Sequence, residues 1–237
     1  GVWDLNGFNE NVDQLSISSG GTLRNGAATS TSTITTISGY TAMLSGPNCQ
    51  FDVSASDGNL NFNGALGGNG SVVKIGAGVL NLNSNNTYTG NTTVNAGTLA
   101  LAFPSLASGS TVAIATNAML QLNFAATNTI GALLLNGVSQ PLGIYNAANT
   151  PAYLAGTGSL QVAIPSQPTN ITYSVSGNSL VLSWPSNYVG WILQSNAVKL
   201  TVSSNWHDVP GSQTNSQFTA PLTIPGISNN YFRLRYP

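Results

Sequence analysis

Apolar residues recur at a fixed interval along the first two thirds of this chain. In the clearest copies a glycine is followed by a variable residue, a leucine, a second variable residue and another apolar residue, as in residues 78–82 (GVLNL). Nine full or partial copies of this mark are separated by 18 to 21 residues, and they begin at Gly1, Gly21, Gly39, Gly58, Gly78, Gly97, Ala118, Gly137 and Gly158. A constant period of this length is typical of repeat architectures.

A second series of short apolar and polar alternations lies half a period away from the first. Its members span residues 12–17, 33–37, 51–53, 72–75, 92–94, 111–114 and 130–135. They are rich in β-branched residues and are bounded by glycine, asparagine and serine, which indicates β-strands. Each repeat is therefore predicted to contain two strands, and no segment has a helical period.

A two-strand unit of about twenty residues cannot bury an apolar face by itself, so the copies must stack. The sequence therefore predicts an all-β fold with a right-handed parallel β-helix over residues 1–164, in which each strand pairs with its equivalent one turn later. The side chains expected to point inward are Leu60, Phe62, Leu80, Leu82, Leu99, Leu101, Leu120 and Leu122. The residues between them, Asn61, Asn81, Ala100 and Gln121, are expected to face outward, and stacked asparagines are expected to form amide ladders.

The period stops at a proline-bearing segment, residues 165–168 (PSQP), which predicts a second domain over residues 165–237. Strands are predicted there at residues 171–175, 179–184, 190–194, 202–209, 216–219 and 231–236. Short strands at this spacing favour a small antiparallel β-sandwich. Residues 178–185 (NSLVLSWP) resemble the second strand of fibronectin type III-like domains, and the resemblance implies that Trp184 packs in the core.

Residues 68–101 carry three motifs in order: KIGAGVL at residues 74–80, NTYTG at 86–90 and VNAGTL at 94–99. In order and spacing they resemble the autotransporter-associated β-strand repeat, also called the passenger-associated transport repeat. Residues 1–15 and 156–160 resemble flanking segments of the same kind of passenger. The resemblance implies a β-helical passenger on the outside of a bacterial cell, often adhesive or structural, and it supplies no catalytic motif.

Charge is scarce. Charged residues make up 5% of the chain, against roughly 25% in typical soluble domains, and none lies between Lys74 and Lys199. With a formal net charge of −1 there is little repulsion between copies, which favours self-association or a surface-bound protein. The few scattered cations argue against a nucleic-acid partner. No apolar run reaches the roughly eighteen residues of a membrane span, so none is expected.

The residue types of catalytic and metal sites are also scarce. His207 is the only histidine, and its neighbour Asp208 is expected to point to the opposite face of a strand. Asp52 and Asp57 form the only close acid pair after residue 13, and their positions in a strand and before a glycine favour structural roles. The single cysteine, Cys49, is expected to be a small buried residue. We therefore expect no enzyme activity, no cofactor and no metal.

Five residues of the C-terminal domain are candidate contacts. Tyr188, Trp191 and Trp206 could form a platform on which sugars stack, or they could belong to the sandwich core. Arg233 and Arg235 alternate with apolar residues and so share one face of the last strand, where they protect an edge or contact a partner.

These observations lead to a hypothesis of a non-catalytic, extracellular structural protein of a bacterial surface. The open ends of a β-helix and the uncharged surface favour head-to-tail self-assembly into a filament. The alternatives are an adhesin or carbohydrate-binding module that uses the C-terminal aromatic residues to bind surface glycans, and a non-catalytic spacer of a larger exported enzyme.

Overall fold

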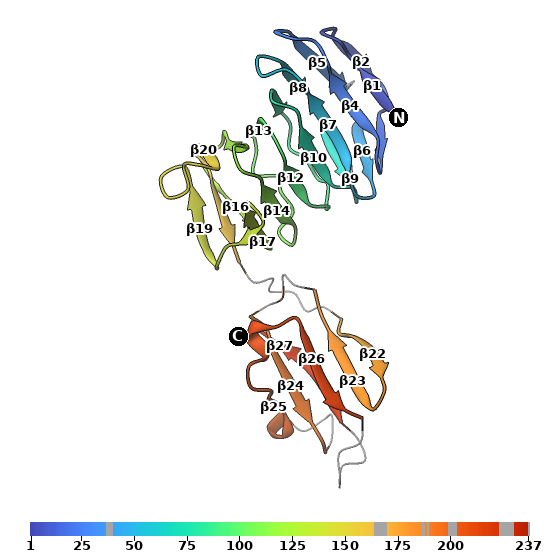
Figure 1. Cartoon of the computed structure of the whole chain (residues 1–237), viewed down its shortest axis with the longest axis vertical. Helices are drawn as coiled ribbons and strands as arrows, with labels where there is room; N and C mark the ends of the chain where they lie inside the picture. The colour runs from blue at the N-terminus through green and yellow to red at the C-terminus, as the bar shows by residue number, and fades with distance from the viewer. Residues whose placement is uncertain are drawn as a thin grey trace. The chain divides into compact units, whose positions relative to one another are not determined.

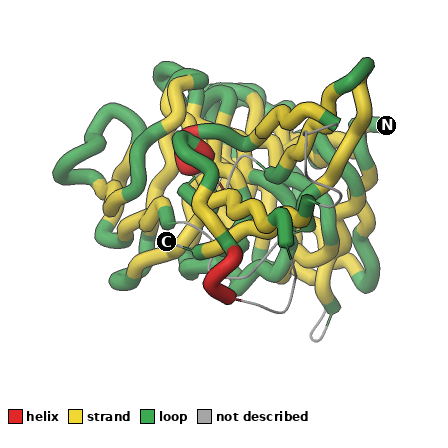
Figure 2. Tube along the Cα trace, turned by 90° about the horizontal axis from the view of Figure 1, so that it is seen from below, coloured by secondary structure: helices red, strands yellow, loops and turns green. Residues whose placement is uncertain are grey.

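The computed structural model of the chain describes residues 1–36, 40–163, 170–185, 188, 190–198, 203–222 and 230–236. The chain divides into two compact units, Gly1–Ala163 (unit 1) and Ile164–Pro237 (unit 2). Gly39 and the predicted linker at residues 165–168 lie outside the described residues. Strands dominate both units, and helical structure among the described residues is limited to 3-10 turns in unit 2, such as η2 (Ser203–Asn205) and η3 (Ser212–Thr214) (Figure 2).

Unit 1 is a parallel β-solenoid of about six turns with rungs of about 23 residues, which confirms the predicted fold class (Figure 1). Its largest sheet, sheet A, has the strand order β1 (Val2–Asp4), β4 (Thr22–Asn25), β7 (Cys49–Val53), β10 (Val72–Ile75), β12 (Thr92–Val94), β14 (Thr111–Ile114), β17 (Ala132–Leu135) and β18 (Val138–Ser139). All neighbours in this sheet are parallel except β17 and β18, which are antiparallel.

Sheet B stacks a second strand from each turn. Its order is β2 (Glu10–Val12), β5 (Thr31–Thr36), β8 (Asn59–Phe62), β11 (Val79–Leu82), β13 (Thr98–Leu101), β15 (Met119–Leu122) and β20 (Leu154–Gly156), and every neighbouring pair is parallel. Sheets A and B together contain the two strands per repeat that the sequence predicts.

Two smaller sheets complete the solenoid. Sheet C, formed by β3 (Ser16–Ser18), β6 (Thr41–Ser45) and β9 (Ala65–Gly68), gives the first turns a third side that the two-strand repeat does not predict. Sheet D contains β16 (Thr127–Ile130), β21 (Ser159–Val162) and β19 (Gly143–Asn146), of which β19 pairs antiparallel with β21.

In the first turns the strands that follow the glycine marks lie in sheet A, whereas those that follow the marks from Gly58 to Ala118 lie in sheet B. The prediction that all of them stack in one sheet is therefore wrong there. β1 and β4, which follow Gly1 and Gly21, stack on β7 in sheet A, whereas β8 after Gly58 belongs to sheet B. Thr22 pairs with Val2, 20 residues earlier, and with Gln50, 28 residues later, so the second turn is longer than the first. The longer turn contains β5 and β6, of six and five residues, whereas the turn before it contains their equivalents β2 and β3, of three residues each, so the glycine marks slip relative to the strands.

The strands that follow the last glycine marks also lie outside the sheet expected for them. β21, which begins after Gly158, pairs with β16 in sheet D, and sheet B continues from β15 to β20 instead. Gly137 lies in the turn between β17 and β18. Because β18 runs antiparallel to β17 and β19 runs antiparallel to β21, a regular spacing in the sequence no longer corresponds to one rung.

The core of the solenoid matches the predicted inward positions. These side chains have no solvent exposure: Leu60, Phe62, Leu80, Leu82, Leu99, Leu101, Leu120 and Leu122. Burial of each stabilises the fold by about 1.5–3 kcal/mol. The expected amide ladders are also present, since Asn81 Nδ2 donates to Asn61 Oδ1 (2.9 Å) and Asn83 Nδ2 donates to Asn63 Oδ1 (2.8 Å). Ala100 lies on the outward face, but its methyl group is too short to reach past its neighbours and is 4% exposed.

The glycines of the repeat differ in how strictly their positions require glycine. The six named from the sequence are Gly1, Gly21, Gly58, Gly78, Gly97 and Gly158. A Cβ atom on Gly78 would lie within 3 Å of the carbonyl oxygens of Ala55 and Gly58, because neighbouring turns approach closely there. Gly97 has a positive φ of 63° and faces the backbone of the preceding turn. At Gly1 an added Cβ would meet nothing within 4 Å.

One charged side chain lies inside the solenoid. Lys74 on β10 is fully buried, and its Nζ donates to the carbonyl oxygens of Ile75 (2.8 Å), Gly76 (2.8 Å) and Ala96 (3.2 Å). The ammonium group thereby holds the turn after its own strand to the equivalent turn of the next rung. Tyr88 is also buried and bonds Thr92 through its hydroxyl (2.8 Å), and burial raises the pKa of Tyr88 to about 12.

The described residues of unit 2 form two three-stranded antiparallel sheets. Sheet E has the order β22 (Thr172–Ser176), β23 (Ser179–Ser183) and β26 (Gln217–Pro221), and sheet F has the order β25 (His207–Asp208), β24 (Ile192–Asn196) and β27 (Tyr231–Arg235). Leu182 and Trp184 pack with Leu193 in a shared core, so Trp184 is buried as expected. Of the strand predicted at residues 202–209, the described residues form only η2 and β25. The fibronectin type III-like assignment stays a prediction.

We predict that Gly78→Ala lowers the free energy of unfolding by about 1–3 kcal/mol, because the methyl group overlaps backbone oxygens that stacked turns hold in place. Denaturant titration followed by circular dichroism measures the loss. Gly1→Ala is the matched control and should leave the stability unchanged, since the position is open. Equal stability of Gly78→Ala and the parent chain would contradict the crowding argument.

A second prediction concerns Lys74. Burial lowers its pKa from 10.5 to about 8, against a smaller opposing effect of Asp52. Between pH 8 and 9 the unfolded chain therefore binds more protons than the folded chain, so the free energy of unfolding should rise with pH, by about 1 kcal/mol. Lys74→Met should remove this rise. Denaturant titrations of both chains at the two pH values test it, and identical pH slopes would refute it.

Candidate functional site

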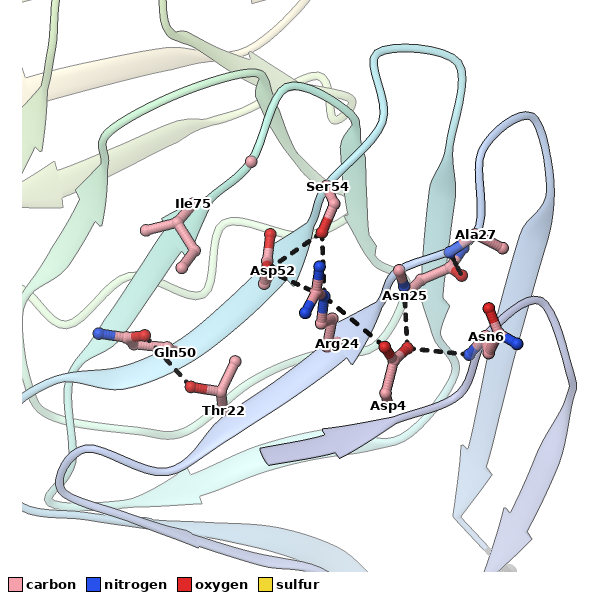
Figure 3. A network of polar contacts seen from close by, with 12 residues as sticks. Asp4, Asn6, Thr22, Arg24, Asn25, Ala27, Gln50, Asp52, Ser54 and Ile75 are labelled. Carbon is pink, nitrogen blue, oxygen red and sulfur yellow. Dashed lines mark hydrogen bonds and ion pairs between the residues drawn. The ribbon is translucent and has the colours of Figure 1, made fainter. Parts of the chain in front are cut away.

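A ladder of charged side chains crosses the first three strands of sheet A. Asp4, Arg24 and Asp52 occupy the same register position on β1, β4 and β7. Arg24 Nε lies 3.7 Å from Asp4 Oδ2 and 3.3 Å from Asp52 Oδ2, and it donates to Ser54 Oγ at 3.0 Å (Figure 3). On the same two strands as Arg24 and Asp52, the hydroxyl Oγ1 of Thr22 donates to Gln50 Oε1 (3.2 Å). The ladder aligns the first three turns on their outer face, and at its partial exposure it adds little to stability.

The acids of this region have structural partners. Asp4 Oδ1 accepts the backbone N–H groups of Asn6 (3.0 Å) and Gly26 (2.9 Å), so the carboxylate also fixes two turns. Asp52 accepts from Ser54 Oγ (3.1 Å) in addition to its ion pair. Asp57, predicted as a turn residue, lies in the turn before β8. Asp52 thus links neighbouring rungs, whereas exposed Asp57 accepts from Ser56 Oγ (3.5 Å) within its own turn.

The other chemically versatile residues are held apart. His207 is paired with Ser195, and Asp208 with Gln194, so the two side chains point to opposite faces as expected. Cys49 is fully buried, and burial raises the pKa of its thiol, whose Sγ donates to the carbonyl oxygen of Ile17 (3.1 Å). Among the described residues, no three His, Cys, Asp or Glu side chains gather as a metal site would require.

Two of the five candidate contact residues of unit 2 belong to an aromatic cluster. The ring of Trp191 lies 5.5 Å from that of Tyr188 and 5.5 Å from that of Tyr236, measured between centroids. Trp191 is 3% exposed, so its ring faces protein and is closed to a ligand in this structure. The interpretation of Trp191 as a core residue fits this packing.

The other three candidates gather on the outer face of sheet F. The guanidinium carbon of Arg233 lies 4.2 Å from the ring centroid of Trp206, and Arg233 Nε donates to Gln194 Oε1 (2.8 Å). Gln194 Nε2 donates to Asp208 Oδ1 (2.7 Å), and Asp208 Oδ2 pairs with Arg235 (3.0 Å). The hydrogen bond from Gln194, together with Arg235, lowers the pKa of Asp208. The sequence could not place Gln194 in this network, because it comes from a separate strand.

The two ends of unit 1 form a further candidate. At the N-terminal end the outer edges of β1, β2 and β3 have no strand partner among the described residues. Exposed Val2, Trp3 and Phe8 surround this end, beside a hollow of about 310 Å³ lined by β1, β3 and β4.

The opposite end of unit 1 carries β18, the last strand of sheet A. It also carries β19, which lies far from β1 (Figure 1). Val138, Leu142 and Ile144 are 53–64% exposed there. Six of the nine exposed large hydrophobic side chains described in unit 1 thus lie at its ends, so the ends rather than the sides are the apolar surfaces.

Comparison with known proteins gives one match. Residues 72–101 match the family model described as passenger-associated-transport-repeat, which covers β10 to β13 and includes Lys74. Neither the curated proteins nor the solved structures give a significant match. The described residues contain no helix long and apolar enough to cross a membrane. The matched repeat suggests the context of an autotransporter-associated passenger, secreted or on a surface.

Proposed function

We propose that this chain is a non-catalytic structural module of an extracellular bacterial passenger, and that its solenoid joins a second copy of the chain end to end. The observation that carries the proposal is the concentration of exposed apolar side chains at the two ends of the solenoid, one of which presents unpaired parallel strand edges. Unpaired edges of this kind readily accept another strand.

The two ends suit a heterologous contact. Asp4 at the N-terminal end is paired with Arg24, but exposed Glu10 and Asp13 leave this end with a negative charge, so two such ends would repel each other. The opposite end has no charged residue between β17 and β19 and exposes apolar side chains. Head-to-tail joining avoids the repulsion, and a heterologous contact that does not close produces a filament.

A role without catalysis is supported by how the reactive side chains are used. Asp52 pairs with Arg24, Lys74 binds three carbonyl oxygens, and Cys49 is buried. General acid–base catalysis needs paired groups with access to a substrate, which these residues do not offer.

The second candidate function, an adhesin that stacks sugars on C-terminal aromatic residues, has less support. The ring of Trp191 is buried, and one face of Trp206 is covered by the guanidinium of Arg233. Stacking on Trp191 would first require that its packing open, and stacking on half-exposed Trp206 would be restricted to the face that Arg233 does not cover.

We predict that the chain associates end to end as its concentration rises, as measured by sedimentation velocity and negative-stain electron microscopy. Phe8→Glu and Ile144→Glu should each abolish the association, because each places a charge in an apolar end. Phe103→Glu is the matched control, since Phe103 is 44% exposed and follows β13, which has two strands beyond it on one side of sheet B and four on the other. Monomers at every concentration, or association that all three variants retain, would contradict the proposal.

A further inference from the structure

The outer face of sheet B is an array of uncharged side chains, most of which are polar. The parallel register aligns outward residues of β5, β8, β11, β13 and β15 into rows along the solenoid. One row is Thr31, Asn59, Val79, Thr98 and Met119, and the next is Thr33, Asn61, Asn81, Ala100 and Gln121. A third row, Asn63, Asn83, Ala102 and Asn123, continues the ladder, because each of these residues donates its backbone N–H to the preceding rung.

The amides in this array are oriented by one another. Asn81 donates to Asn61 and Asn83 to Asn63, while Gln121 Nε2 donates to Asn123 Oδ1 (3.0 Å). A primary amide has two N–H donors and two acceptor lone pairs, and a ladder bond uses one of each at most. The remaining donors and acceptors of half-exposed Asn61 and Asn81 and of exposed Asn63 and Asn83 are therefore held in fixed directions toward solvent. Groups fixed in advance lose less entropy when a ligand binds.

The dimensions of the array suit a chain-like ligand. Strands about 4.8 Å apart place five outward residues along a row of about 19 Å, and rows two residues apart are separated by about 7 Å. Hydrogen-bonding side chains thus lie along the solenoid axis at multiples of an interval near the length of one sugar ring, and the apolar residues Val79, Ala100, Ala102 and Met119 interrupt the rows. A single small molecule would use only a fraction of this periodicity.

The outer faces of sheets B and A differ in charge. None of the residues in the three rows is charged, whereas the outer face of sheet A carries Asp4, Arg24 and Asp52. An anionic polymer would find no cation in the rows, and a cationic one no anion. The chemistry that fits is neutral, rich in hydroxyl groups and periodic.

We propose that the outer face of sheet B binds a neutral polysaccharide, with the polymer lying along the rows and its hydroxyl groups bonded to the Asn61–Asn81 and Asn63–Asn83 ladders. This surface lies on the solenoid and is distinct from both the apolar ends and the aromatic residues of unit 2. It adds a binding role to the structural function proposed above, and either can fail without the other.

The test is co-sedimentation of the full chain with insoluble cellulose, chitin and mannan, with soluble polygalacturonate as an anionic competitor. We expect the chain to bind at least one of the neutral polymers, to remain bound in 1 M salt as an interaction without ion pairs should, and to ignore polygalacturonate. Failure to bind any of the three, or release by salt or by polygalacturonate, would overturn the proposal.

Variants locate the surface. Asn83→Arg and Asn123→Arg each place a long cation in the third row, and each should weaken binding at least tenfold, so the result does not depend on one variant's folding. Asn95→Arg is the matched control, because Asn95 is an equally exposed asparagine that follows a strand of sheet A. Trp206→Ala should also bind like the parent chain. Equal binding by all four variants, or loss with Asn95→Arg or Trp206→Ala alone, would place the site elsewhere.

Discussion

The backbone hydrogen-bond ladder between successive rungs is the interaction on which the rest of unit 1 depends. Each inner strand from β4 to β14 in sheet A and from β5 to β15 in sheet B satisfies its peptide groups on the strands one turn before and after it, in register. Side chains at equivalent positions therefore stack on themselves, leucine on leucine inside and asparagine on asparagine outside. Because the strands pair in register, the repeat in the sequence produces one continuous apolar core and continuous rows of similar side chains on the surface.

Close stacking restricts what can occupy the turns. Between the middle rungs the backbones approach so closely that Gly78 has no room for a Cβ atom, and Lys74 spans the same region by bonding carbonyl oxygens of two successive turns. The matched repeat coincides with this part of the solenoid. Its glycines and lysine can be understood as the residues that let one turn lie directly on the next.

The scarcity of charge has consequences for each surface. Three of the seven charged residues of unit 1 form the Asp4–Arg24–Asp52 ladder at the start of the stack, and after Lys74 the surface of the unit uses only uncharged side chains. Apolar side chains are exposed chiefly at the ends, where the ladder stops and a core rung has no cover. Sides and ends thus differ in the kind of partner that they can accept.

The sequence by itself determined the fold class, the two-strand repeat, the inward leucines and the amide ladders, because these follow from local alternation and a constant period. Only the tertiary structure decided that Gly1 and Gly21 precede strands of sheet A, that sheet C adds a third side, and that β18 and β19 run antiparallel to β17 and β21. Those outcomes depend on turn lengths and on which strand edge is free, neither of which a local pattern encodes. Likewise, Arg233 was predicted to share a face with Arg235, but its contacts with Trp206 and Gln194 arise because antiparallel pairing brings together strands 39 residues apart.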